Sequence, residues 1–168
     1  MERWWSIEVR GWLRFLVGRR PVVTLLRVVV FLVLYFGVFR QVYQPIRVTG
    51  VSMEPTYRDG RIKLLNVRAY RGGVMPQRFD VVAVRKKDTL RVLLKRVLGL
   101  PGEVVEVVGG AVYVGGERVD EPYVQGRGIS GTRRPVRLGE DEYFIIGDNR
   151  EVTAYGVVTL DEILGRAK

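Results

Sequence analysis

A long apolar run near the N-terminus restricts this chain more than any other feature. Residues 22–39, VVTLLRVVVFLVLYFGVF, carry a single charged side chain, Arg27. As an α-helix the run would reach about 27 Å, close to the ~30 Å hydrocarbon core of a bilayer. The run is apolar on every face and is flanked by arginines, whereas a helix at the surface of a soluble core has a polar face. The sequence therefore predicts a transmembrane helix over residues 21–40.

The flanks of the run predict how the chain lies in the membrane. The residues that follow, RQVYQPI, lack the small residues at A-x-A spacing of a cleavable signal peptide, so we expect a retained anchor. Residues 1–20 form a basic amphipathic segment that suits the membrane interface, and its apolar stripe is Trp5, Val9, Trp12, Leu13 and Leu16. Arginine is abundant in the same segment. This favours a cytoplasmic N-terminus in a cell membrane and an extracytoplasmic domain over residues 41–168.

Beyond residue 41 the pattern changes to short β-branched runs separated by glycine. We expect a mainly β protein in which the single helix precedes an all-β domain of antiparallel sheets. Residues 124–141 are predicted to form a polar loop, and residues 159–168 a final helical turn capped by Thr159 and Glu162. The expected strands are 80–85, 89–100, 103–108, 111–114 and 142–147, with glycine turns at 109–110 and 115–116.

Composition excludes several classes of active site. The chain has no His and no Cys, which rules out a Ser-His-Asp triad, a Cys-His protease and a His-ligated zinc site. Its net charge of +10 indicates an anionic partner, either an acidic lipid surface or nucleic acid.

Ser52 lies in the turn-forming stretch VTGVSMEPTYRDG, directly after the predicted anchor. A structural role is the ordinary explanation for a single serine. If Ser52 is a nucleophile, its base has to be a carboxylate, an amine or the N-terminus, because histidine is absent.

Lys95 is the strongest candidate among the few lysines. In LRVLLKRVLGL it shares a strand face with Leu93 and Val97, which predicts an apolar environment. Burial would lower its pKa and allow the neutral amine to accept a proton, although a lysine that extends from a strand edge into solvent fits the same pattern. The other lysines are predicted to face solvent, to lie in a turn or to be terminal: Lys63, Lys86, Lys87 and Lys168.

Three ordered segments resemble the type I signal peptidases, which are membrane-bound Ser/Lys proteases. They are SMEPT at 52–56, LKRVLGLPGE at 94–103 and YFIIGDNR at 143–150. Weaker matches are RFDVVAV at 78–84, VDEPYV at 119–124 and YGVV with EILGRA between 155 and 167. Together they cover most of residues 46–167 in the order of the family.

The resemblance implies a function and a set of site residues. Ser52 would be the acylating nucleophile and Lys95 its general base, without metal or cofactor. The substrates would be signal peptides of exported preproteins, cut after small residues at A-x-A sites. Met53, Leu93 and Leu94 would form shallow pockets for these small residues. The extended substrate would pair as an added strand beside residues 48–50 and 93–95.

Two positions depart from the family pattern. Gly50 stands where some members have a serine that donates its hydroxyl to the oxyanion, so backbone N–H groups would replace that donor. The segment after GDNR is shortened, which leaves Thr153 at the position of a family serine. Thr153 would orient the lysine amine, while Asp148 and Arg150 would support the loop.

Other functions remain open at this stage. A non-catalytic, membrane-tethered basic module would explain the net charge, but the strands lack an aromatic stacking motif, so we expect anionic lipid rather than nucleic acid as a partner. Self-cleaving Ser-Lys repressors share the dyad, yet they are soluble proteins with a DNA-binding domain. Aspartic protease and metal hydrolase functions are disfavoured, because Asp88-Thr89 precedes Leu90 rather than Gly and acids do not cluster at metal-ligand spacing.

Overall fold

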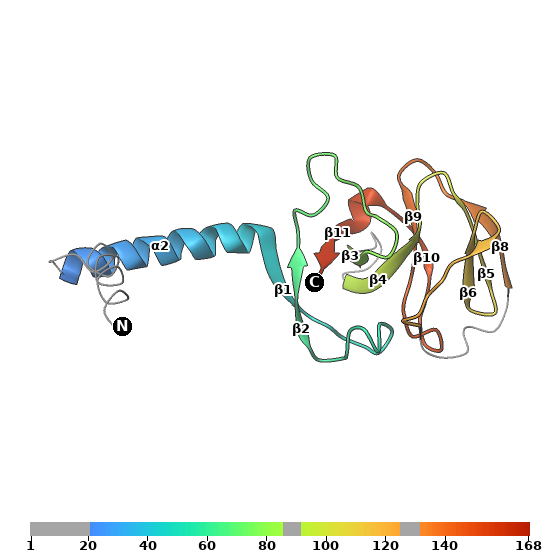
Figure 1. Ribbon diagram of the computed structural model, residues 1–168, viewed down its shortest axis with the longest axis horizontal. Coiled ribbons are helices and arrows are strands. Elements are labelled where there is room, and N and C mark those ends of the chain that lie inside the picture. Colours follow the sequence, from blue (N-terminus) through green and yellow to red (C-terminus); the bar gives the residue numbers. More distant parts are fainter. Residues whose placement is uncertain (1–20, 86–91, 125–131) are drawn as a thin grey trace, which may run out of the picture. The chain divides into compact units, whose positions relative to one another are not determined.

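The computed structural model describes residues 21–85, 92–124 and 132–168. The predicted amphipathic segment 1–20 lies outside these residues, as do the first three residues of the strand expected at 89–100. Within the described chain, one helix, α2 (Pro21–Val42), is followed by a domain of β-strands (Figure 1). The chain divides between Gln41 and Val42 into two units, and the second unit ends at Lys168.

Helix α2 is the transmembrane candidate. Its most apolar 18-residue window has a mean hydropathy of 2.6, and none of this window is buried within the protein. The helix extends two residues beyond the predicted end at residue 40. By its length and composition, the helix is able to cross a bilayer.

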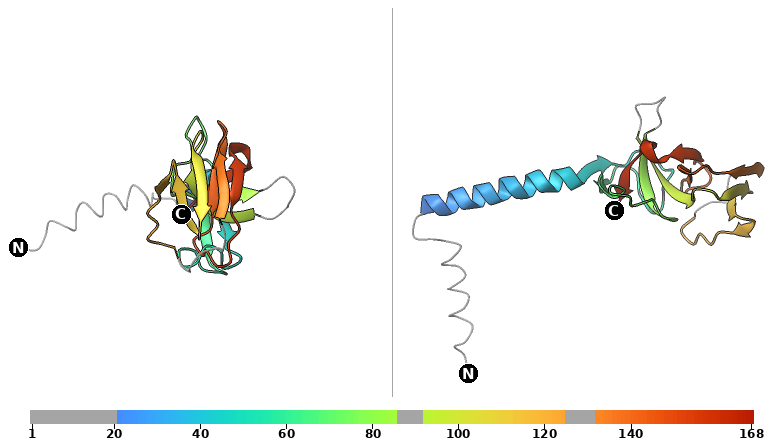
Figure 2. Two further views of the ribbon diagram at one scale, coloured as in Figure 1. Left: turned by 90° about the vertical axis from the view of Figure 1, so that its right-hand side faces the viewer. Right: turned by 90° about the horizontal axis from the view of Figure 1, so that it is seen from above.

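The larger sheet has seven antiparallel strands in the order β1-β2-β11-β3-β4-β9-β10. The smaller sheet has four, in the order β7-β6-β5-β8, so the predicted antiparallel all-β domain is confirmed. In Figures 1 and 2 the smaller sheet lies at the opposite end of this domain from β1 and β2. The strands are β1 (Tyr43–Arg47), β2 (Ile62–Asn66), β3 (Val81–Arg85), β4 (Val92–Gly99), β5 (Val104–Val108), β6 (Ala111–Val114), β7 (Glu117–Arg118), β8 (Thr132–Arg137), β9 (Glu142–Ile146), β10 (Gly156–Thr159) and β11 (Ile163–Ala167).

The β-branched runs form the core of the domain. One cluster joins the two sheets and consists of Leu98, Val105, Val107, Val112, Leu138, Phe144 and Ile146. A second covers the middle of the larger sheet, with Val82, Val84, Val97, Tyr143, Ile145 and Val158. A third cluster contains Val48, Met53, Tyr57, Val81 and Ala167, and it packs against Leu94. This third cluster anchors the turn that carries Ser52.

The loop predicted over residues 124–141 is wrong in part, because β8 lies inside it. The strand is polar since it is an edge strand, and among the described strands it pairs only with β5. Pro135 falls where the register shifts between Val105 and Val107, a position at which a missing N–H is tolerated.

The C-terminal helical turn is shorter than predicted. A single 3-10 turn covers Leu160–Glu162, and the backbone N–H of Thr159 donates to the Glu162 carboxylate at 3.0 Å. The residues that follow form β11, between β2 and β3, because the centre of the sheet supplies strand partners on both sides. The solvent position predicted for Lys63 is also wrong: it is half-buried, with Nζ 5.2 Å from the centre of the Tyr57 ring.

Candidate active site

Ser52 lies in a turn that the backbone holds from several directions. Gly50 has φ +90°, a conformation that a side chain would strain, and its N–H donates to Asp59 Oδ1 at 2.8 Å. The next residue, Met53, is only 1% exposed and accepts a hydrogen bond from the Tyr57 N–H at 2.8 Å. Together these contacts fix the position of the half-buried Ser52 side chain.

Lys95 reaches the same place from β4. Its Cα lies opposite Val82 of β3, and the residue is only 4% exposed. The Nζ atom donates to Ser52 Oγ at 2.8 Å and to Thr153 Oγ1 at 3.1 Å. The predicted burial of Lys95 is therefore confirmed, and its amine is directed at one serine and one threonine.

Burial changes the proton affinity of this amine. Desolvation lowers the pKa of Lys95 to about 8, against the opposing effect of the negative charge on Asp148. A lysine with a pKa of about 10.5 has almost no neutral form at neutral pH, whereas one at about 8 is neutral in roughly a tenth of the molecules. The neutral amine can accept a proton from a hydroxyl within hydrogen-bond distance.

Thr153 is held by the backbone around it. Its Oγ1 accepts the Gly147 N–H at 3.0 Å and donates to the Ala154 carbonyl at 3.0 Å. Gly147 allows this approach, because a Cβ there would lie 2.2 Å from Thr153 Oγ1 and 2.3 Å from the Ser52 carbonyl oxygen. The loop after β9 and the Ser52 turn are thus in direct backbone contact.

A second contact joins the same loop to the Ser52 turn through Asn149. The Asn149 backbone N–H donates to the Ser52 carbonyl at 3.1 Å. Its side-chain Nδ2 donates to the Val51 carbonyl at 3.2 Å. Both bonds stabilise the backbone of the Ser52 turn.

Asp148 is fully buried and ion-paired beneath the site. Arg96 donates Nε to Asp148 Oδ1 at 2.8 Å and Nη2 to Oδ2 at 2.6 Å, and Thr56 Oγ1 donates to Oδ2 at 2.5 Å. The Arg96 guanidinium also stacks on Tyr123, with Cζ 3.9 Å from the ring centre. This bidentate pair connects β4, next to Lys95, with the loop after β9.

Arg150 is buried but contacts a different region. Its Nε donates to the Gly147 carbonyl at 3.1 Å, and its terminal nitrogens donate to the Gly110 carbonyl and to Glu121. Gly110 lies in the turn between β5 and β6, so Arg150 links the site loop to the smaller sheet.

Gly50 and Ser52 differ in what their backbone N–H groups offer. The Gly50 N–H is already bonded to Asp59. In the described part of the chain, the Ser52 N–H donates no hydrogen bond. A negative oxygen formed beside Ser52 would therefore find its backbone donor at residue 52.

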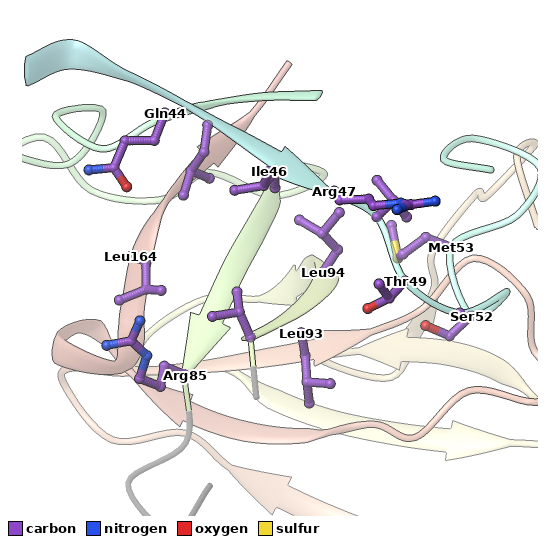
Figure 3. Close-up of a pocket in the computed structure, with 14 residues that line it drawn as sticks. Gln44, Ile46, Arg47, Thr49, Ser52, Met53, Arg85, Leu93, Leu94 and Leu164 are labelled. Carbon is purple, nitrogen blue, oxygen red and sulfur yellow. The ribbon is translucent and has the colours of Figure 1, made fainter. Parts of the chain in front are cut away.

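A cleft of about 310 Å³ opens beside Ser52. The predicted pocket residues Met53, Leu93 and Leu94 all line it, and Figure 3 shows them between Ser52 and the far end of the cleft. Its other lining residues are Gln44, Ile46, Arg47, Val48, Thr49, Gly50, Leu65, Arg85, Val92 and Leu164. These side chains come from β1 to β4, β11 and the Ser52 turn.

One edge of β4 is open next to the cleft. Residues Val92–Arg96 pair with β3 on one side, whereas β9 pairs with β4 only from Arg96 onward. Over Val92–Lys95 the second edge has no strand partner among the described residues. An extended peptide could add a strand there.

The sequence did not identify Arg96, Gly147 and Asn149 as residues of the site. Arg96 follows Lys95 directly, and Gly147 and Asn149 flank Asp148, so each was close to a residue that was identified. Their partners are distant in sequence, and no local pattern encodes such contacts. Among the described residues, no group of three or more acids could hold a metal ion.

The sequence comparisons with known proteins indicate one family. The sequence profile of the family "Signal peptidase, peptidase S26" matches residues 22–168. Signal peptidase IB of Staphylococcus aureus is 32% identical over 164 residues, which cover 84% of this chain and 84% of that protein. Signal peptidase I P of Bacillus subtilis subsp. natto is 30% identical over 138 residues, or 73% of each chain. A solved signal peptidase I from Enterococcus faecalis V583 has 28% sequence identity and a TM-score of 0.47, and the match covers 55% of this chain and 96% of that chain.

Proposed function

The chain belongs to the signal peptidase family, peptidase S26, and on this basis we propose that Ser52 is the nucleophile and Lys95 the general base of its reaction. The protein is a membrane-anchored serine peptidase that acts on the signal peptides of preproteins. The observation that carries the proposal is the 2.8 Å distance between Lys95 Nζ and Ser52 Oγ, with Lys95 buried.

The first half of the reaction forms an acyl-enzyme. Neutral Lys95 accepts the hydroxyl proton of Ser52 while Oγ attacks the scissile carbonyl carbon. The negative charge develops on the carbonyl oxygen, and the N–H of Ser52 donates to it. The protonated Lys95 then gives its proton to the leaving amine, and the C–N bond breaks.

The second half releases the signal peptide. A water molecule attacks the acyl carbon, and Lys95 accepts its proton. The proton then returns to Ser52 Oγ as the ester bond breaks. Thr153 accepts a hydrogen bond from Lys95 and directs the amine toward Ser52 throughout. Asp148 and Arg150 act on the loop and do not touch the reacting atoms.

The lining of the cleft supports a substrate specificity. Met53, Leu93 and Leu94 contribute apolar side chains to it, which suit small residues at the first and third positions before the scissile bond. The open edge of β4 over Val92–Lys95 supports pairing of the extended substrate as an added strand. We therefore expect cleavage at A-x-A sites.

The test is cleavage of a preprotein with an A-x-A site by the purified full-length protein in detergent. Ser52→Ala and Lys95→Ala are each expected to lose at least about a thousandfold in kcat/KM. Lys168→Ala is the control, because it removes an exposed lysine whose ammonium lies near Tyr43 rather than near the Ser52 turn, and it is expected to retain activity. Cleavage retained by either active-site variant would defeat the assignment.

For the topology, we propose a cytoplasmic N-terminus in the plasma membrane and an extracytoplasmic catalytic domain, with anionic lipids around the basic N-terminal segment. The absence of cysteine allows a direct test. In intact cells, a membrane-impermeant maleimide should label Ser130→Cys and leave Ser6→Cys unlabelled. The reverse pattern would contradict this orientation.

A further inference from the structure

The cleft next to Ser52 has a pronounced charge imbalance. Among the described residues, its lining includes two arginines, Arg47 and Arg85, and no carboxylate. Arg85 is exposed and forms no ion pair with any residue in the described part of the chain. We propose that Arg85 is a specificity-determining residue that binds an acidic side chain of the preprotein about four to six residues before the scissile bond. This inference rests on the proposed function.

Strand register gives the distance from Arg85 to the reaction. Lys95 lies opposite Val82, and Arg85 lies opposite Val92, three positions earlier on β4. At about 3.3 Å per residue this separation is roughly 10 Å along the strand. An extended substrate beside β4 spans this length with about three residues. Arg85 stands on β3, which β4 separates from the open edge, so its long side chain has to pass over Val92 to meet the side chain of a substrate residue. The flexibility of both side chains allows a range of one or two residues.

The face of the sheet determines where the arginine points. Arg85 pairs with Val92, so it lies on the same face as Leu94, whose partner is Ala83. Leu94 packs against the cluster that contains Met53 and Val48. Figure 3 shows Arg85 and Ser52 at opposite ends of the cleft, with Leu93 between them. The guanidinium is therefore available to a peptide that occupies the cleft.

The chemistry of the guanidinium favours one class of side chain. Its planar N–H groups can donate two parallel hydrogen bonds to the two oxygens of a carboxylate. Asn, Gln or a backbone carbonyl offers a single oxygen and cannot accept both bonds in this way. A lysine or arginine of the substrate at the same place would be repelled, and no acid among the lining residues that the structure describes offsets that repulsion. The cleft thus discriminates both for an acidic residue and against a basic one.

Peptides that differ at one position test the proposal. Each peptide spans an A-x-A site and carries Glu, Gln or Lys at the fourth, fifth or sixth position before the scissile bond. With the full-length protein in a neutral detergent at low salt, we expect kcat/KM to follow Glu > Gln > Lys at one of these positions, with a Glu-to-Lys ratio of about three to ten. The difference should lie mainly in KM and decrease with added salt.

Variants of the protein assign the effect to one residue. Arg85→Gln is expected to bring the ratio close to one, and Arg85→Glu to invert it. Arg134→Gln is the matched control, since it removes an exposed arginine from β8 in the other sheet and should keep the wild-type ratio.

Two results would overturn the inference. Equal cleavage of the Glu, Gln and Lys peptides by the unmodified protein would remove the selectivity itself. An equal loss of selectivity in Arg134→Gln and Arg85→Gln would assign it to net charge rather than to the cleft. Neither result bears on the Ser52 and Lys95 assignment, which is tested separately by whether Ser52→Ala cleaves the Gln peptide.

Discussion

The Nζ atom of Lys95 lies 2.8 Å from the Oγ atom of Ser52, although the two residues are 43 positions apart in the chain. The contact joins a strand of the larger sheet to a turn that precedes it. Lys95 is buried and has a lowered pKa, so it can exchange a proton with the serine hydroxyl near neutral pH.

Thr153 is predicted to position the amine of Lys95. Thr153→Val keeps the shape but removes the acceptor for Nζ and for the Gly147 N–H. We expect kcat to fall about tenfold to a hundredfold with little change in KM, as for the loss of a buried hydrogen bond. Thr153→Ser should restore most of the activity, since its hydroxyl can occupy the same place. Equal activity of the Val and Ser variants would contradict this role.

Asp148 is predicted to affect both stability and proton affinity. Asp148→Asn leaves the Arg96 guanidinium without its charged partner, and we expect the free energy of unfolding to fall by about 3 kcal/mol. The negative charge of Asp148 raises the pKa of Lys95, so its removal should move the acid limb of the kcat/KM profile to lower pH. Thermal unfolding measures the change in stability, and the pH profile of kcat/KM measures the shift of the acid limb. The control is Asp120→Asn at an exposed position, which should change neither quantity.

Gly147 is predicted to tolerate no side chain. Gly147→Ala would bring a Cβ within 2.3 Å of the Ser52 carbonyl oxygen, so either the Ser52 turn or Thr153 has to move. We expect loss of cleavage by at least about a hundredfold together with a lower melting temperature. Gly37→Ala is the control, because a Cβ there meets nothing within 4 Å. An Ala variant at 147 with full activity would refute the close backbone contact.

Lys95 is predicted to lower stability at neutral pH. The folded state binds the lysine proton less tightly than the unfolded state. Below a pH of about 8, protonated Lys95 therefore lowers the free energy of unfolding. This destabilisation disappears as the pH rises to about 10.5. Lys95→Met should therefore increase the free energy of unfolding at pH 7 by about 1–3 kcal/mol, while abolishing cleavage. Above pH 10 the stability gain should vanish. Denaturant unfolding at both pH values checks this, and a gain independent of pH would contradict it.

The sequence predicted much of the domain because its strands are short β-branched runs. The strand expected at 111–114 coincides with β6, and the one at 80–85 begins one residue before β3. Strands whose residues are polar or mixed were missed. The polar β8 is stabilised by pairing with β5, and β11 by its place between β2 and β3, and neither partner is visible in a local pattern.

The candidate site was predictable to a similar extent. Strand alternation made Lys95 the strongest candidate among the lysines, and the resemblance to the type I signal peptidases gave it the role of general base. The supporting contacts were not predictable. Gly147 against Ser52 and Arg96 against Asp148 join segments that are far apart in sequence, and only the folded chain brings them together.

The central claim is that a neutral Lys95 activates Ser52, and the pH dependence of kcat/KM tests it most directly. For the full-length protein and a peptide whose own groups do not titrate between pH 6 and pH 10, the account predicts about a tenfold rise per pH unit below an apparent pKa of about 8 and a plateau above it. Lys168→Ala should keep that profile. A rate that does not change across this range would contradict the account.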